Sequence, residues 1–481
     1  MIKDTINIIK LLYTITWELF LFKLNNLLNY LTNKPKIERL VLIKNLTHKL
    51  ESMNILYIKV FQSLCLENQI LNEDEQNYLI KYIDNVPYNS DSIDYTYLDI
   101  LNKEYNIHLE NELLNNNTNH SLINSGIVGV VFKGFQNNID NRLVIKILKN
   151  NISNDLHNVY NELMIIAKII SYLPYLKNFN IYRMLNDNKN ILLNQTNFLS
   201  EVTNLEIFKE KYANMPQFRI PHVYREITEK YNNIIVMENI EGLKINNIKK
   251  YNNEIKEEFA KLILEFGYIS VLYNSACHCD LHAGNIFFYM NNENINVNVN
   301  ENSYETNLPK YQLGIIDFGI CSYPSKESQN HYYNFFNNIQ LKNEVNQVNE
   351  VNQVNQVNQD NQDNQVNQVN EVNVLDYLKY FIDPKDKLNN LTYYEELILN
   401  KQFNNIIEDF KFKNNVYDFF YNINNLLKKY DLYLSSQFNK IVLSISIANS
   451  LVNNLTTNSR DLENEVFEKF VAMNNLFSIN E

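Results

Sequence analysis

The chain has 481 residues, of which 45% are hydrophobic and 12% aromatic, so a wholly disordered protein is excluded. Lys and Arg number 43 against 55 Asp and Glu, and the net charge of −12 argues against nucleic acid as the main partner, because phosphate backbones are repelled. Four cysteines in a chain of this length exclude a disulfide scaffold and indicate a reducing compartment.

The N-terminal segment is apolar and aromatic. Its most apolar run, Leu11 to Phe22, contains Glu18 and is followed by Lys23, so no stretch reaches about 20 uninterrupted apolar residues. Acidic residues precede the first arginine, Arg39, which is unlike an organelle transit peptide. We therefore predict no transmembrane segment, no transit peptide and an intracellular, cytoplasmic location. We expect the aromatic helix to pack in a core, and peripheral membrane contact is the alternative.

Helical and strand patterns follow one another along the first half of the chain. Residues 5–115 repeat apolar side chains at helical spacing and predict a helical extension. From Leu122 to Leu148, two β-branched runs flank a polar turn and predict a hairpin. The pattern from Asp155 to Leu173 is helical again, and Ile234 to Asn239 predicts a buried strand.

The second half is mainly helical and contains two low-complexity segments. Glu254 to Ala276 predicts a long apolar helix. Asn291 to Asn302 is nearly all Asn, Glu, Ile and Val, and residues 343–373 repeat the triplet VNQ or VNE, which fits neither a helix nor a strand. We predict that both are solvated loops and that the second is largely disordered. Helical segments rich in aromatic residues resume after Val374.

Glycine occurs only eight times, where an average usage of about 7% would give roughly 34. In such a chain, a remaining glycine is expected where a side chain would not fit or where φ is positive. Five of the eight lie in the motifs described below: Gly126, Gly129, Gly242, Gly284 and Gly319.

The predicted hairpin carries a phosphate-binding pattern. Asn124, Gly126 and Gly129 have the spacing of a GxGxxG loop with Asn in the first place, and Val131 follows. Lys146 lies fifteen residues beyond Val131, where the VAIK lysine of protein kinases falls. Backbone N–H groups of such a loop approach phosphates, and an opposed ammonium neutralises their charge. Taken alone, the pattern also fits an ordinary hairpin with one lysine.

A second cluster follows the long apolar helix. His278, Asp280 and Asn285 match HxDxxxxN, and Asp317 opens a DFG sequence. A carboxylate on a tight loop orients a hydroxyl and accepts its proton, while an amide oxygen and a second carboxylate hold Mg²⁺ against nucleotide phosphates. The order of lysine, HxDxxxxN and DFG therefore predicts Mg²⁺-dependent ATP binding, with Asp280 as the catalytic residue and Asn285 and Asp317 as metal ligands.

These motifs resemble those of the UbiB/ADCK family of atypical protein-kinase-like proteins. The catalytic loop of that family, HxDxHxGN, is matched in full by HCDLHAGN from His278 to Asn285. The family's KxGQ signature is similar to KVFQ, with Lys59 and Gln62 in place and Phe61 where glycine is expected. The resemblance implies a regulatory role for Lys59 and Gln62, and a link to membranes and to lipid or quinone metabolism.

The same resemblance implies a partner for Lys146 and a hinge. QTNFLSEVTNLEIF is similar to the family's glutamate segment through Glu201 and Asn204, which implies that Glu201 pairs with Lys146. MENIEG looks like the family's hinge segment and implies that Glu238 contacts the nucleotide. Glu162, sixteen residues after Lys146 in a helical pattern, is the alternative partner of the lysine.

The sequence departs from the family in two elements. Gln195 and Asn197 stand where the family carries the two carboxylates of an E-x-D pair, and NSGIVG is closer to a conventional glycine loop than to the family's alanine-rich loop. Together with Phe61, the lost carboxylates suggest a rewired contact between the KxGQ-like and E-x-D elements. No APE segment follows Asp317, which agrees with the family and indicates that the acceptor need not be a protein.

Three other interpretations stay open. A small-molecule phosphotransferase of the aminoglycoside or choline kinase type has a similar catalytic loop but lacks a KxGQ leader. A nucleotide-binding pseudokinase scaffold would have lost turnover together with the E-x-D acids. A metal or redox site built from Cys277, His278, Cys279 and His282 has the wrong spacing for a zinc clamp and would need four ligands from one short loop.

We predict an α+β, two-lobed protein-kinase-like fold with a small β-rich N-lobe and a helical C-lobe. The predicted boundaries are residues 1–115 for the N-terminal helical extension with the KxGQ-like segment, 116–242 for the N-lobe and 243–481 for the C-lobe, interrupted by the repeat at 343–373. The predicted activity is that of an ATP-dependent phosphotransferase or ATPase with ATP and Mg²⁺ as cofactors. The acceptor, a lipid, a small molecule or a protein, is unknown.

Overall fold

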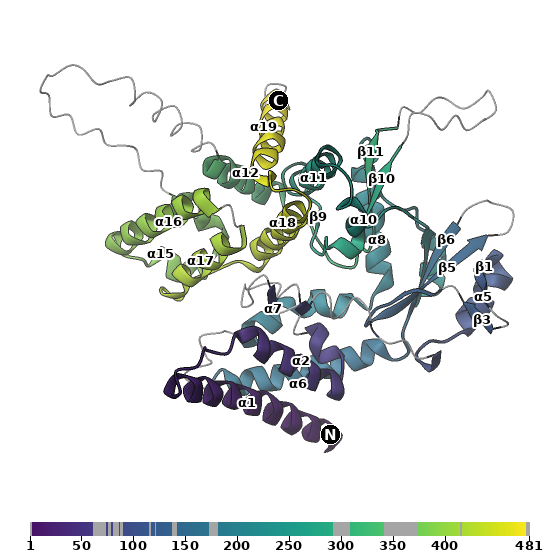
Figure 1. The fold of residues 1–481 in the computed structure, drawn as a ribbon, viewed down its shortest axis with the longest axis horizontal. Coiled ribbons are helices and arrows are strands. Elements are labelled where there is room, and N and C mark those ends of the chain that lie inside the picture. Colours follow the sequence, from purple (N-terminus) through teal and green to yellow (C-terminus); the bar gives the residue numbers. More distant parts are fainter. Residues whose placement is uncertain are drawn as a thin grey trace, which may run out of the picture. The chain divides into compact units, whose positions relative to one another are not determined.

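Figure 1 shows the fold of the chain in a computed structural model, which describes residues 2–60, 74–75, 78–79, 86, 90–114, 117–120, 122–136, 142–172, 181–291, 308–340, 374–413 and 416–477. The chain divides into two compact units, and each is described by itself. Unit 1 comprises Met1–Met215, Arg219–Gly242 and Gly314–Ile320, and unit 2 comprises Pro216–Phe218, Leu243–Leu313 and Cys321–Glu481. The repeat at 343–373 and most of the segment at 291–302 lie outside the described residues.

Helices form the first part of unit 1. The long helix α1 (Ile2–Leu31) packs against α2 (Arg39–Met53) and α6 (Ile152–Ile170), because it has one protein-facing side on which Leu11 is fully buried. Residues 56–60 form a further helical stretch. The other helices of unit 1 are η1 (Ser90–Ser92), α5 (Thr96–Tyr105), α7 (Ile181–Asn194), α8 (Phe198–Lys211) and α9 (Arg225–Lys230).

A sheet of order β1-β5-β6-β8, with β4 also paired to β5, follows in unit 1. The predicted hairpin is present as β5 (Gly129–Gln136) and β6 (Arg142–Leu148), which pair antiparallel. Alternate side chains of these strands, such as Phe132 and Ile145, enter one apolar core, as the period of two requires. The other strands of unit 1 are β1 (Ile107–Leu109), β4 (Leu122–Ser125), β8 (Ile234–Glu238) and the separate pair β2 (Asn111–Leu114) and β3 (Asn117–His120).

The predicted helical pattern up to residue 115 is wrong for its last part. Helix α5 ends at Tyr105 because Asn106 adopts the left-handed conformation, with φ of 53°, which is a common way for a helix to stop. The chain then enters the sheet, where Ile107 lies opposite Gln136 of β5. The sheet therefore begins within the stretch that helical spacing assigned to the extension.

Unit 2 is mainly helical. Helix α11 (Asn253–Tyr268) packs against α18 (Ser436–Leu455) and α19 (Ser459–Phe477), and Phe381 stacks on Phe438 with ring centroids 4.3 Å apart. The remaining helices are α10 (Ile245–Ile248), η3 (Ile269–Tyr273), η4 (Ala283–Asn285), α12 (Lys326–Gln340), α14 (Val374–Leu378), η5 (Lys379–Phe381), α15 (Lys385–Asn389), α16 (Tyr393–Lys413) and α17 (Val416–Lys428). The other described strands of the chain are β7 (Phe218–Arg219), β9 (Cys277–His278), β10 (Ile286–Met290), β11 (Tyr311–Ile315), β12 (Cys321–Ser322), β13 (Ile382–Asp383) and β14 (Tyr433–Leu434).

The prediction that the chain has no transmembrane segment is wrong. Within the described residues, one helical segment, Thr5–Leu31 of α1, is long and apolar enough to cross a membrane. The sequence argument required an uninterrupted apolar run, whereas a helix of this length tolerates isolated charges. One of those charges, Glu18, is buried in an ion pair with Lys49 of α2. The predicted cytoplasmic location depended on the absence of such a helix and is wrong for the same reason.

Candidate active site

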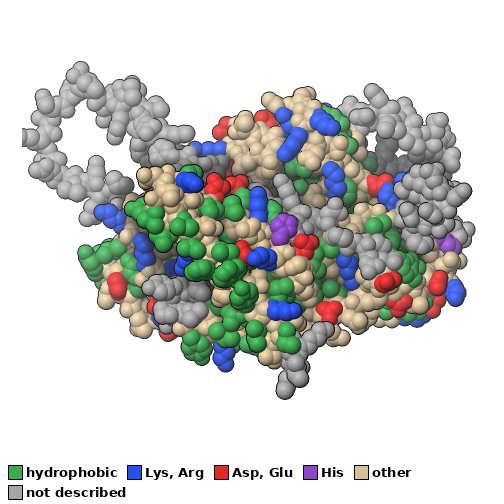
Figure 2. All heavy atoms as spheres, turned by 60° about the horizontal axis from the view of Figure 1, so that its bottom comes forward, with side chains coloured by type: hydrophobic (Ala, Val, Ile, Leu, Met, Phe, Trp, Pro, Cys, Tyr) green, Lys and Arg blue, Asp and Glu red, His purple; other side chains and the backbone are tan. Residues whose placement is uncertain are grey.

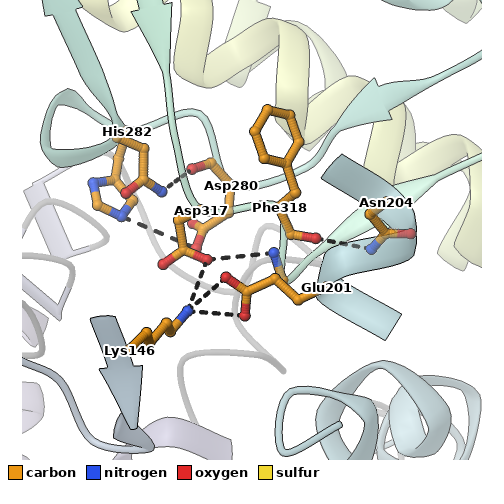
Figure 3. A network of polar contacts seen from close by, with 9 residues as sticks. Lys146, Glu201, Asn204, Asp280, His282, Asp317 and Phe318 are labelled. Carbon is orange, nitrogen blue, oxygen red and sulfur yellow. Dashed lines mark hydrogen bonds and ion pairs between the residues drawn. The ribbon is translucent and has the colours of Figure 1, made fainter. Parts of the chain in front are cut away.

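Lys146 in the middle of β6 contacts a glutamate that is distant in sequence. Its Nζ lies 2.7 Å from Glu201 Oε1 and 2.8 Å from Oε2, and both side chains are largely buried (Figure 3). Glu201 lies in the first turn of α8, and Asn197 caps that helix by accepting a hydrogen bond from the Ser200 N–H. The residue that replaces a family carboxylate at position 197 therefore holds the start of the helix that carries Glu201.

Glu162, the alternative partner, lies elsewhere. It is buried on α6, where its carboxylate accepts hydrogen bonds from the Tyr57 hydroxyl and, at 3.2 Å, from Asn7 Nδ2 of α1. These contacts join α6 to the N-terminal helices. Burial, followed by the hydrogen bond to Glu162, raises the pKa of Tyr57, so its hydroxyl stays protonated and remains a donor.

Asp317 lies beside the lysine in the same unit. Its Oδ1 is 3.6 Å from Lys146 Nζ, and its φ of 62° is in the left-handed region, which is strained for a residue other than glycine. The next peptide is held by Asn204 of α8, whose Nδ2 donates to the Phe318 carbonyl at 2.8 Å. The Phe318 ring packs on Phe208 with centroids 4.9 Å apart. Helix α8 therefore fixes both the lysine and the DFG segment.

The charges of this cluster keep the lysine ionised. Burial by itself would lower the pKa of Lys146, but the nearby carboxylates of Asp317 and Glu201 outweigh it and raise that pKa. Burial also pushes the pKa of the Glu201 carboxyl upward, and the charge of Lys146 opposes this rise. Lys146 therefore stays protonated, and its ammonium can donate hydrogen bonds to an anionic ligand.

The glycine-bearing turn precedes β5. The Gly126 N–H donates to the Gly129 carbonyl at 3.0 Å, which closes a two-residue turn. A Cβ on Gly129 would lie 2.9 Å from the Ile147 carbonyl oxygen, so a side chain would not fit there. Val131 lies opposite Lys146 in the β5–β6 pairing. Lys149, which sequence reasoning missed, donates from Nζ to the Gly126 carbonyl at 2.7 Å.

Two other predicted positions are in unit 1. Glu238 ends β8, and its carboxylate accepts a hydrogen bond from the His222 N–H at 3.1 Å and lies 3.9 Å from Arg219 Nη2. Lys59 is half-buried in the helical stretch of residues 56–60. Gln62 and Phe61 lie outside the described residues.

Unit 2 contains the HxDxxxxN loop. His278 is fully buried on β9, where its Nδ1 accepts a hydrogen bond from the Asp280 N–H at 3.3 Å. Asn285 Nδ2 donates to the Asp280 carbonyl at 2.9 Å, which brings the two ends of the loop together. His282 Nε2 is 4.0 Å from Asp280 Oδ2, a contact that is drawn as a dashed line in Figure 3. The loop thus presents the Asp280 carboxylate and the Asn285 amide from one rigid turn.

The sequence comparison identifies the family. The model of the ABC1 atypical kinase-like domain matches residues 107–352, which is more than half of the chain. The chain belongs to this family. The match confirms the resemblance to UbiB/ADCK proteins and the predicted protein-kinase-like fold, with a β-containing first part and a helical second part.

Individual relatives of this ABC1-family chain are distant. A probable protein kinase UbiB from Enterobacter sp. (strain 638) is 26% identical over 208 residues, which cover 40% of this chain and 34% of that protein. A probable protein kinase UbiB from Pasteurella multocida (strain Pm70) is 25% identical over 167 residues, covering 32% and 31%. The alignments thus span about a third of the length of these curated relatives. A solved complex of Rv3197 with erythromycin from Mycobacterium tuberculosis is 15% identical, with a TM-score of 0.38 and coverage of 72% and 86%.

The donors in the two ABC1-family motifs suit a magnesium ion. Asp317 is a carboxylate that is about half exposed, with a side-chain exposure of 45%, and carboxylate and amide oxygens are the ligands that Mg²⁺ prefers. The Asn285 amide uses its nitrogen within the loop, so its oxygen is the atom that can ligate a metal. The cysteines beside Asp280 are less suited to bind a metal. Cys277 and Cys279 are buried, and burial raises the pKa of the Cys277 thiol, which disfavours the thiolate form that binds metals.

Proposed function

We propose that this ABC1-family chain binds Mg²⁺-ATP and transfers or hydrolyses the γ-phosphate. Lys146 would contact the α- and β-phosphates, with Glu201 holding it in place. Asp280 would orient the acceptor hydroxyl or a water molecule and accept its proton, while Asn285 and Asp317 would hold the metal. A bound Mg²⁺ would neutralise the charge that develops on the phosphate oxygens. The turn with Gly126, Gly129 and Val131 would cover the phosphates, and Glu238 would lie at the nucleotide hinge.

One observation carries this proposal. The Lys146 ammonium lies between two carboxylates, at 2.7 Å from Glu201 and 3.6 Å from an Asp317 whose backbone is strained. Left-handed backbone at residues other than glycine clusters at ligand-binding positions, and here it accompanies a largely buried lysine that faces two carboxylates.

The acceptor is proposed only as a class, a lipid, a small molecule or a protein. The name of these relatives, probable protein kinase UbiB, is consistent with phosphoryl transfer. A pseudokinase scaffold is the second candidate, because Gln195 and Asn197 replace two family acids. The presence of Lys146, Asp280 and Asp317 favours turnover over this alternative.

Calorimetric titration of ATP with and without Mg²⁺ tests binding, and labelled ATP tests turnover. We expect Mg²⁺ to tighten binding in the native chain, and Asp317→Ala to remove that effect. Asp431→Ala is a matched control, since Asp431 also has positive φ, 54°, but lies exposed in a turn. Asp280→Asn should keep binding and lower turnover by about 10²-fold or more. Equal turnover in the native chain and both site variants would exclude catalysis here, and binding without turnover would favour the scaffold.

We also propose that helix α1 contacts a lipid bilayer. Figure 2 shows the side of the molecule that lies at the bottom of Figure 1, where hydrophobic side chains gather over α1. Ile9, Trp17 and Phe20 are exposed by 62%, 41% and 53% on this helix. Within Thr5–Leu31 the exposed charged side chains are Lys10 and Lys23, although the chain as a whole is acidic. An apolar face with basic residues fits an anionic membrane.

The single tryptophan makes this contact measurable. Trp17 is the only tryptophan of the chain, so its emission reports α1 alone. We expect a blue shift and co-sedimentation with vesicles of phosphatidylcholine and phosphatidylserine, and weaker binding for Lys10→Ser with Lys23→Ser. Resistance of the bound protein to alkaline carbonate would indicate a spanning helix, and release would indicate peripheral contact. Unchanged emission with no co-sedimentation would contradict the membrane proposal.

A further inference from the structure

Lys244 is the residue immediately before α10, two residues after Gly242, and lies in unit 2. Its Nζ donates to the Gly284 carbonyl at 2.8 Å and lies 3.6 Å from the centroid of the Phe287 ring. A charged donor makes a stronger hydrogen bond than a neutral one, and the aromatic ring stabilises the ammonium further. Sequence reasoning assigned no role to this lysine, because it lies outside every motif.

The carbonyl held by Lys244 belongs to the peptide that enters Asn285. A peptide group is planar, so the Gly284 carbonyl and the Asn285 N–H move as one unit. The Asn285 N–H donates to the His282 carbonyl at 2.9 Å. The peptide is therefore held at both ends, by Lys244 on its oxygen and by the loop itself on its nitrogen.

The lysine contact adds to an anchor that already exists. Leu243 and Phe288 form a β-bridge, with reciprocal backbone hydrogen bonds of 2.9 Å in each direction. This bridge joins the segment after Gly242 to β10 through the backbone. The additional bond from Lys244 reaches further, to the residue next to the metal-binding candidate. The bond from Lys244 therefore orients the backbone of Asn285. Through that backbone it also orients the Asn285 side-chain amide, whose nitrogen already donates to the Asp280 carbonyl.

We propose that Lys244 is a positioning residue for Asn285. By holding the Gly284–Asn285 peptide, Lys244 orients the Asn285 amide oxygen so that it can bind a divalent cation. The inference rests on the proposed function, since it assigns Asn285 to the metal. Partners that orient metal ligands without touching the metal typically change metal affinity by about 10- to 100-fold when removed. We expect the lower end for Lys244, because His282 still holds the nitrogen of the peptide.

Three variants test this role. Lys244→Met removes the ammonium and keeps the stem on Phe287, and Lys244→Arg restores a charged donor. Lys249→Met is the matched control, because Lys249 follows α10 directly, is exposed and contacts Asn454. For each protein, ATP binding is titrated at a series of Mg²⁺ concentrations and also without Mg²⁺. Amide hydrogen exchange of residues 280–288 is measured without any ligand.

We expect Lys244→Met to raise the half-saturating Mg²⁺ concentration about tenfold, to leave Mg²⁺-free ATP affinity unchanged, and to speed exchange in residues 280–288. Lys244→Arg should restore most of the native Mg²⁺ dependence and most of the native protection from exchange. Lys249→Met should match the native chain. Unchanged Mg²⁺ dependence in Lys244→Met would overturn the role, as would an equal loss of affinity with and without Mg²⁺. If Lys244→Met does not fold, Lys244→Arg is compared with Asn285→Ala. An equally weak Mg²⁺ dependence of ATP binding in these two variants would overturn the role of Lys244. Absence of Mg²⁺-dependent ATP binding in the native chain would instead overturn the proposed function, whatever the exchange shows.

Discussion

Replacement of Glu201 by Gln removes one carboxylate from the Lys146 cluster and keeps the shape of the side chain. At an effective dielectric constant of about 20, unit charges 2.7 Å apart attract by about 6 kcal/mol, and charges 3.6 Å apart by about 5 kcal/mol. Asp317 therefore continues to compensate the ammonium in the variant, although its greater exposure screens it more. Loss of one partner of a buried pair typically costs about 3–5 kcal/mol, so we expect about 3 kcal/mol for Glu201→Gln.

A double-mutant cycle isolates the ion pair from the other effects of substitution. We expect Lys146→Met with Glu201→Gln to be more stable than the sum of the two single variants predicts, because the uncompensated charge is gone. The exposed pair Lys230–Glu104 is the matched control, since its charges are also 2.7 Å apart but lie in solvent, where little coupling is expected.

Guanidinium unfolding measures these effects. Far-UV circular dichroism follows the whole chain, and Trp17 fluorescence follows unit 1, which contains the entire cycle. A free energy of unfolding is extracted where the two probes coincide. Additivity of the two single variants within about 0.5 kcal/mol would show that the buried pair is not coupled, and would refute the reasoning that assigns Glu201 to Lys146.

Two further predictions concern packing and pH. Gly129→Ala should destabilise the chain by about 1–3 kcal/mol and weaken ATP binding, because its Cβ would meet the Ile147 carbonyl at 2.9 Å. Gly126→Ala is the control, with its nearest contact at an ordinary 3.7 Å, and equal melting temperatures in the two variants would contradict the packing argument. Burial raises the pKa of the Glu463 carboxyl, so its contribution to stability is largest in acid and falls as the pH rises above the pKa of an exposed glutamate. The melting temperature of Glu463→Gln should therefore rise relative to that of the native chain as the pH increases from about 4 to about 8. A difference between the two melting temperatures that does not change with pH would contradict a raised pKa for Glu463.

Local periodicity predicted the hairpin, because alternate residues of β5 and β6 enter one core. Periodicity also extended the predicted helix wrongly over residues 107–114. A single left-handed residue, Asn106, ends α5, and the spacing of apolar residues does not reveal where a helix stops in this way. The membrane prediction failed for a different reason. A strict apolar run was required of α1, although one of its charges, Glu18, is neutralised by Lys49 from the next helix.

The sequence predicted some residues of the site and missed others. Motif spacing selected residues that carry charge or oxygen donors, such as Lys146 and Asp317. Spacing alone did not separate Glu201 from Glu162, because two helices, α6 and α7, intervene between β6 and α8 and their packing decides which glutamate reaches the lysine. Lys149 and Lys244 were missed for a simpler reason. Each acts by donating to a backbone carbonyl, and a carbonyl leaves no mark in the sequence.

The DFG segment belongs to unit 1 although the chain on both sides of it belongs to unit 2. A fragment that stops at Gly242 would lose Asp317, and with it the second counter-charge of the lysine and the aromatic ring that covers Phe208. Truncation at that glycine therefore does not release an intact half of the molecule. Any attempt to split this protein into two polypeptides for reassembly has to return residues 314–320 to the first piece.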